Sequence, residues 1–357
     1  MRRPQFILFI VLFYTGMAFA SATTLEKEEE GFKIRVSDDG GAFTLSYVSE
    51  KTNSPIDFFV SHNDYASTYF SVLVDDMVYQ LRRGSVSSIN LVEKDQCVGL
   101  IFKLKEKLNV GVNFTFVPEV SRKGQGAIKV EVELENISSK SLDVALKGVF
   151  DTILGENAGV HFATAPYPYV STEESFTNMS QLEWVRSSNG DESVQFLFDG
   201  NGITRPKMVA VANKDVLIGE RWIPIIKSGR TFNSVFSYNN SALCALWNTI
   251  TLAPATKGTV TFYITMASKA KIPPTAQFLG EKGANLTGSD EILYTDSDGV
   301  VFSLGAITDN MLNMQYIIND LLNRIRMLEE DPANVDRNEL LRLNAELDAI
   351  LEKVRRL

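Results

Sequence analysis

A strict two-residue alternation of apolar and polar side chains is the feature that most constrains the fold of this chain. In the segment AIKVEVELEN, residues 127–136, an apolar side chain precedes every Lys or Glu. Successive side chains of a β-strand point to opposite faces. The segment therefore predicts a strand with one face in a core and the other in water. The segment TVTFYITM, residues 259–266, repeats the alternation.

Further short strands are expected along most of the chain. Residues 99–117 predict two strands that break near residues 107–109, and residues 193–198 and 207–213 predict one strand each. Turn-forming segments such as SDDGGA, RKGQG and SSNGDE separate the strands. Many short strands without helices between them predict a mainly-β fold. We expect a large antiparallel β-sandwich over residues 23–305, either one extended sandwich or two fused ones.

The apolar period changes after the predicted sandwich. From Ile307 to Leu328, and again from Leu340 to Leu357, apolar residues are spaced alternately four and three apart. This spacing is the heptad pattern of packed helices. Pro332 interrupts the first helix, and Asp336 with Glu339 is similar to a capping box that begins the second. Residues 306–357 are therefore expected to form an antiparallel helical hairpin.

Additional apolar side chains of the hairpin lie outside its heptad seam and widen its apolar stripe. The hairpin is expected either to pack on its own β region, or to bind another protein or a second copy of the chain. For the second alternative, the predicted partner-binding residues are Leu312, Ile317, Leu322, Leu341 and Leu351.

The first 22 residues predict a cleaved secretory signal peptide. Arg2 and Arg3 precede an apolar segment at residues 6–20, and small residues follow at the spacing that signal peptidase needs. The expected location is the periplasm, with secretion as the alternative. No later segment approaches the length of a membrane span. The net charge of −9 argues against a general attraction to nucleic acid or to acidic membrane surfaces.

Cys97 and Cys244 are the only cysteines of the chain. In an oxidising compartment they could form one disulfide; the alternative is two buried thiols on separate strands. Two cysteines and two histidines are too few to suggest a zinc site. The sequence contains no phosphate-binding loop or dinucleotide-binding fingerprint. We therefore expect neither a metal nor a cofactor.

The loop DTILGENAGVHF, residues 151–162, carries the most concentrated set of candidate acid–base residues. Asp151, Glu156 and His161 could together transfer protons. The alternative is a structured connection whose polar side chains satisfy backbone groups. The sequence favours this alternative, because the spacing does not bring the three residues together and no nucleophile is adjacent.

Two further positions are candidates for ligand contact. His62 lies beside Asp64 and Tyr65, and Trp222 in GERWIPI is the strongest candidate for stacking on a sugar. The alternative for Trp222 is an aromatic side chain of the β core. The candidate ligand residues are therefore His62, Asp151, His161 and Trp222, and no residue is assigned a catalytic role.

A large β-sandwich that carries two histidines and acidic residues is similar to the aldose mutarotases. This resemblance concerns the fold only and transfers no site residue. Residues 132–162, followed by LWNTITLAPATKGTVTFYI at residues 246–264, resemble uncharacterised exported bacterial β-sandwich proteins. That resemblance covers about residues 60–265 and implies a fold and export, not an activity.

The expected function is a non-enzymatic periplasmic structural or accessory role. Through its hairpin the chain would assemble with a protein partner, or with itself, in an envelope complex such as motility, secretion or cell-wall machinery. The alternative is a carbohydrate-binding, mutarotase-like or lyase-like β-sandwich that acts on glycans. An aromatic-lined cleft with histidine and carboxylate groups would favour this alternative.

Overall fold

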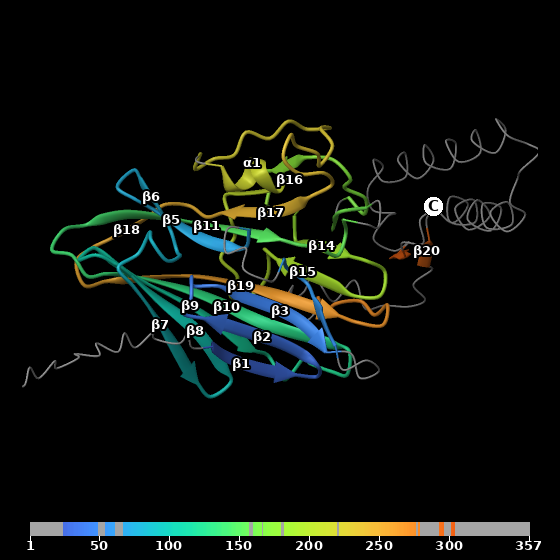
Figure 1. Cartoon of the computed structure of the whole chain (residues 1–357), viewed down its shortest axis with the longest axis horizontal. Coiled ribbons are helices and arrows are strands. Elements are labelled where there is room, and N and C mark those ends of the chain that lie inside the picture. The colour runs from blue at the N-terminus through green and yellow to red at the C-terminus, as the bar shows by residue number, and fades with distance from the viewer. Residues whose placement is uncertain are drawn as a thin grey trace, which may run out of the picture.

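Layered antiparallel sheets make up the described part of the chain (Figure 1). The computed structural model describes residues 24–48, 54–60, 67–156, 160–165, 167–179, 182–219, 221–275, 278, 293–295 and 301–303. Strands form nearly all of the regular elements in this part of the chain, and the pairings between the named strands are antiparallel, which confirms the prediction of a mainly-β, antiparallel fold. The predicted signal peptide, His62 and the whole helical hairpin, with its five partner-binding residues, lie outside the described residues.

The largest sheet has eight strands in the order β12-β14-β15-β19-β10-β9-β8-β7. Their bounds are β7 Ser88–Lys94, β8 Cys97–Leu104, β9 Leu108–Phe116, β10 Gln125–Asn136, β12 Ala163–Thr164, β14 Trp184–Ser188, β15 Ser193–Leu197 and β19 Lys257–Ala267. The expected break near residues 107–109 falls between β8 and β9, at residues 105–107.

A seven-stranded sheet faces the eight-stranded one, with the order β13-β16-β17-β11-β5-β6 and β18 paired to β11. Its strands are β5 Tyr69–Val74, β6 Met77–Gln80, β11 Leu142–Asp151, β13 Glu174–Phe176, β16 Met208–Asn213, β17 Ser241–Leu246 and β18 Ile250–Leu252. A third sheet contains β1 Thr24–Glu29, β2 Phe32–Ser37, β3 Phe43–Val48 and β4 Pro55–Asp57, and a separate pair contains β20 Leu293–Thr295 and β21 Val301–Ser303.

One continuous hydrophobic core includes residues of the eight-stranded, seven-stranded and four-stranded sheets. The predicted alternation explains it: in β10 and β19, Val132 and Val260 are direct partners and both are buried. Phenylalanine rings fill the space between the sheets; for example, the ring centroids of Phe150 and Phe196 lie 4.7 Å apart. Such aromatic pairs add to the burial of apolar area that stabilises the sandwich.

A short helix, α1 at Lys214–Ile218, lies on the outer face of the seven-stranded sheet (Figure 1). The expectation that no helix lies between the strands is therefore wrong. The Asn213 side chain caps the helix by accepting a hydrogen bond from the Asp215 backbone amide at 2.9 Å. Small side chains beneath it, including Ala210, Ala212 and Ala242, belong to a second hydrophobic cluster with Leu217.

Both cysteines are free thiols. Cys97 lies half-buried on β8, whereas Cys244 is fully buried on β17 in the other sheet. Of the two alternatives left open by the sequence, separate thiols therefore hold, although only one of them is buried. Among the described residues, no helix has the length and apolar character needed to cross a membrane.

Candidate functional site

Three polar side chains line up across the outer face of the seven-stranded sheet. In the antiparallel register, Gln80 of β6 pairs with Ser71 of β5, and Ser71 pairs with Lys147 of β11. Directly paired residues place their side chains on the same face of a sheet. Tyr69, two residues before Ser71 on β5, lies on that face as well. Strand register alone therefore gathers these four side chains.

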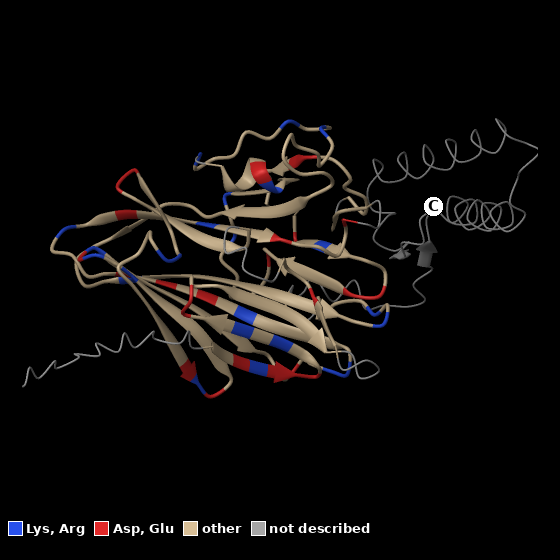
Figure 2. Cartoon of the chain, viewed as in Figure 1, with Lys and Arg blue, Asp and Glu red and all other residues tan. Residues whose placement is uncertain are grey.

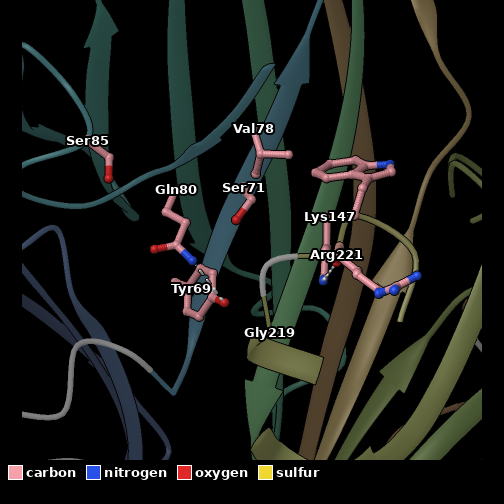
Figure 3. A pocket seen from close by; sticks show the side chains of 9 residues that line it. Tyr69, Ser71, Val78, Gln80, Ser85, Lys147, Gly219 and Arg221 are labelled. Carbon is pink, nitrogen blue, oxygen red and sulfur yellow. Dashed lines mark hydrogen bonds between the residues drawn. The ribbon is translucent and has the colours of Figure 1, made fainter. Parts of the chain in front are cut away.

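The segment after α1 supplies the opposite wall. Helix α1 ends at Ile218 with Gly219 as its C-cap, and Arg221 and Trp222 then lie over the sheet. Trp222 is half-buried and packs against the second hydrophobic cluster. The two groups of residues enclose an open cavity of about 270 Å³, here called the Lys147 pocket (Figure 3). It is lined by Tyr69, Ser71, Val78, Gln80, Ser85, Lys147, Gly219, Arg221 and Trp222.

Lys147 is the central charged group of the pocket. The residue is only 4% exposed, and its Nζ donates hydrogen bonds to the carbonyl oxygens of Leu217 at 2.9 Å and Arg221 at 3.4 Å. An ammonium has three N–H donors, so these contacts leave one for a ligand. Burial lowers the pKa of Lys147, because desolvation disfavours its charged form.

Tyr69 carries the second polar group with a shifted pKa. Burial raises the pKa of its hydroxyl to about 12, and the positive charge of Arg82 opposes that effect. The Gln80 amide nitrogen donates to the Tyr69 hydroxyl at 3.5 Å. At neutral pH Tyr69 is therefore a neutral phenol that can donate its own hydroxyl proton.

A separate group of hydrogen-bonded residues, the His161 cluster, contains Glu156, His161, Asn239 and Ser241. The His161 Nδ1 lies 2.6 Å from the Ser241 hydroxyl oxygen, and the Nε2 lies 2.7 Å from the Asn239 amide oxygen. The Asn239 amide nitrogen donates to the Glu156 carbonyl oxygen, which fixes the orientation of the amide. The Glu156 carboxylate accepts from the Ser241 backbone amide at 3.3 Å.

These contacts define the tautomer of His161. The Asn239 amide oxygen can only accept, so the Nε2 carries the proton. Burial lowers the pKa of His161 and keeps the ring neutral, so the Nδ1 accepts a hydrogen bond from the Ser241 hydroxyl. The order serine, histidine and orienting amide is that of an activated nucleophile. However, Ser241 is only 1% exposed and His161 only 3%, so a substrate has no access to the hydroxyl.

Lys214, the first residue of α1, links Asp151 to the Glu156 carboxylate of this cluster. Its Nζ lies 3.9 Å from the carboxylate of Asp151, which is fully buried. Burial raises the pKa of Glu156 to about 7, and the Ser241 backbone amide and the charge of Lys214 oppose this shift. A Cβ at Gly155 would overlap the His161 carbonyl, so only glycine lets the loop pass close enough to place Glu156 here.

The structure thus brings Asp151, Glu156 and His161 into one network, although the sequence spacing did not require it. His161 is buried and hydrogen-bonded to Ser241 and Asn239, whereas Glu156 is half-buried and accepts from a backbone amide. Asp151 is fully buried beside Lys214. Ser241 and Asn239 were not recognised because they lie about 80 residues further along the chain. We assign the cluster to folding rather than to chemistry.

Trp222 is the predicted ligand residue that lies at the Lys147 pocket. Sequence reasoning missed Lys147, Tyr69, Gln80 and Arg221. One signal was present: Lys147 interrupts the apolar segment VALKGVF at residues 144–150. A lysine within a strand whose neighbours are all buried is rare unless it has hydrogen-bond partners.

No protein-family model matches the sequence, and a search of curated proteins finds no relative. Similar solved structures include a putative aldose 1-epimerase from Escherichia coli K12, with a TM-score of 0.42, 10% identity, and coverage of 69% of this chain and 99% of that one. A galactose mutarotase-like protein from Lactobacillus casei has a TM-score of 0.42 and 10% identity, with coverage of 68% and 100%. An aldose epimerase homologue from C. elegans has 9% identity at the same TM-score and covers 70% of this chain.

These neighbours contradict the expectation of a non-enzymatic structural protein that assembles through its hairpin, because they are described as aldose epimerases or mutarotase-like proteins. The expectation that the chain is not an enzyme is corrected for the same reason. The carbohydrate alternative agrees with them better. The likeness concerns the β-sandwich fold only, and no site residue is taken from these proteins.

Proposed function

We propose that this protein recognises a carbohydrate in the Lys147 pocket. The observation that carries the proposal is the combination of an aromatic ring, Trp222, with hydrogen-bonding side chains around one open cavity. A sugar ring has apolar C–H faces and a rim of hydroxyl groups. An aromatic face matches the former, and Ser71, Gln80 and Lys147 match the latter.

The size of the cavity limits the ligand. Pockets for drug-sized molecules have volumes of about 300–1,000 Å³. The Lys147 pocket, at about 270 Å³, lies just below this range and is open to solvent. It therefore suits one sugar ring, with the rest of a longer glycan outside the cavity.

Saturation-transfer NMR with the full chain and a panel of monosaccharides and disaccharides tests the proposal. We expect at least one sugar to bind, and Trp222→Ala to weaken its binding by roughly tenfold, the value of about one stacking contact. Trp184→Ala is the matched control, because Trp184 is also half-buried but lies on β14 of the other sheet. Failure of every sugar to bind, or equal losses in both variants, would overturn the proposal.

The same samples test for turnover. Lys147 and Tyr69 line the cavity and can each exchange a proton with a bound sugar. Freshly dissolved α-anomers of any sugar that binds are followed by polarimetry with and without the protein. A faster approach of the optical rotation to its equilibrium value that requires Lys147 and Tyr69 would show anomerisation at this site.

A further inference from the structure

The Lys147 pocket differs in charge from the rest of the protein. The chain has a net charge of −9, yet none of the described residues that line the pocket is acidic. Lys147 and Arg221 are both in the lining, and Arg82 is close enough to Tyr69 to influence its hydroxyl electrostatically. Among the described lining residues, both charged side chains are therefore positive, which favours a negatively charged ligand.

Among the described residues, no carboxylate forms an ion pair with Lys147. Its two hydrogen bonds go to backbone carbonyls, one of them at the carboxyl end of α1. Within the described part of the chain no carboxylate accepts from its Nζ. The lowered pKa of Lys147 agrees with this arrangement, because a paired carboxylate would have acted in the opposite direction.

A neutral sugar would leave the positive charges of this pocket without an anionic partner. Its hydroxyl groups are donors as well as acceptors, and carboxylates are the strongest partners for hydroxyl donors. The described lining offers ammonium, guanidinium, amide and hydroxyl groups instead. A buried ammonium with a remaining N–H gains most from an anionic acceptor, which also offsets the cost of its desolvation.

We propose that the ligand of the Lys147 pocket is an acidic sugar, whose negatively charged group is bound by Lys147 and Arg221 while its ring packs on Trp222. The proposal rests on the proposed carbohydrate function and names its ligand class. The anionic group is a carboxylate, as in a uronic acid, or a phosphate, since both are recognised by the same donors.

The decisive comparison needs no mutation. Glucuronate, its neutral amide glucuronamide, glucose and glucose 6-phosphate are titrated against the full chain by saturation-transfer NMR at low salt. We expect an anionic sugar to bind roughly tenfold or more tightly than glucose or glucuronamide, since a hydrogen bond between charged groups is about that much stronger than a neutral one. The better of glucuronate and glucose 6-phosphate identifies the anionic group.

Variants then locate the effect. Lys147→Met should remove the preference for the anion, Lys147→Arg should keep part of it, and Arg221→Ala should reduce it. Lys129→Met is the control with the same change in net charge, since Lys129 lies on the outer face of β10 in an ion pair with Glu131 at 2.7 Å. Circular dichroism verifies the fold of each variant, and Arg221→Ala, at an exposed position, serves where Lys147→Met does not fold.

The titrations and the variants distinguish failure of the inference from failure of the proposed function. If glucose and glucuronamide bind as tightly as the anionic sugars, the inference is wrong while the carbohydrate function stands. The inference is equally overturned if Lys129→Met weakens anion binding as much as the pocket variants do. If no sugar binds at all, the proposed function itself fails.

Discussion

The outer faces of the two large sheets differ, although each sheet turns its inner face to the same core. On the eight-stranded sheet, the outer face of β10 carries the charged side chains of Lys129, Glu131 and Glu133, which are half-exposed. Acidic and basic positions recur along the strands of the lower part of Figure 2. On the seven-stranded sheet, α1 and the segment after it cover part of the outer face, and the strand residues that pack beneath α1 are buried. An exposed face can carry any polar side chain, whereas a covered face can carry one only with a partner. The candidate site lies on the covered face.

The largest expected effect comes from adding a charge to the covered face. Ala210 is fully buried beneath α1, and its strand partner is Cys244. Ala210→Lys should lower the free energy of unfolding by on the order of 3–5 kcal/mol, because the ammonium would be buried without a partner. Thr259→Lys on the exposed face, opposite Glu133, should change it by less than about 0.5 kcal/mol. Urea denaturation measures both, and similar losses would show that the two faces do not differ as described.

The second-largest expected effect is a dependence of the free energy of unfolding on pH. Burial raises the pKa of Glu156 to about 7 in the folded protein, above its ordinary value of 4.5. Between these values the folded state binds the proton more strongly than the unfolded state does, so stability falls as pH rises from about 4.5 to above 7. The loss is at most about 3 kcal/mol.

Glu156→Gln should remove that loss. The free energy of unfolding of the variant, compared with that of the unmodified protein, should therefore be more favourable at pH 8 than at pH 5. Thermal unfolding of both proteins across this range tests it. Glu133→Gln, in an exposed ion pair with Lys257, is the control and should leave the pH profile unchanged. A profile that Glu156→Gln does not alter would mean that the carboxylate is better solvated than its burial implies.

His161→Ala should destabilise the protein by about 2 kcal/mol, because it leaves the buried Ser241 hydroxyl and the Asn239 amide oxygen without their partner. Chemical denaturation measures the loss, and sugar binding should persist in the folded variant. If instead stability were unchanged and sugar binding or turnover vanished, His161 would belong to the functional site rather than to the fold.

The smallest expected change in stability comes from breaking an ion pair on the exposed face of the eight-stranded sheet. Lys257 lies 2.7 Å from Glu133 and 3.7 Å from Glu135. Lys257→Ala should lower the free energy of unfolding only slightly, because exposed ion pairs contribute little. The cost should shrink further at high salt, where the charges are screened. A large, salt-independent loss would contradict the description of this face as solvated.

The strands of the eight-stranded sheet were the most predictable part of the molecule. In β10 the apolar face is buried in the core and the Lys and Glu face is half-exposed, so the alternation appears directly in the sequence. The sequence of β19 alternates in the same way, although Thr261 and Thr265 of its second face are also buried. The strands of the seven-stranded sheet carry a weaker signal, because every residue of β17 is buried. Helix α1 was missed for a related reason: at five residues it is too short to show a helical period.

The candidate site could be predicted only in part. Trp222 was recognised because an aromatic residue flanked by charges is unusual in a strand-rich chain, whereas Tyr69, Ser71 and Gln80 have no distinctive sequence context. They become neighbours of Lys147 through strand register across β6, β5 and β11. The sequence of one strand does not specify which residue of another strand will lie opposite.

By itself, the sequence determined the β class, the position of most strands and which side chains of the alternating strands face the core. These properties follow from local periodicity, since the two faces of a strand are distinguished within the strand itself. The tertiary structure decided which sheet face is covered, that Lys147 is buried beneath Arg221, and that Asp151, Glu156 and His161 share one network. Those outcomes depend on contacts between residues about 70–85 positions apart, such as Lys147 with Leu217 and Glu156 with Ser241, which only the packing of the sheets and α1 brings together.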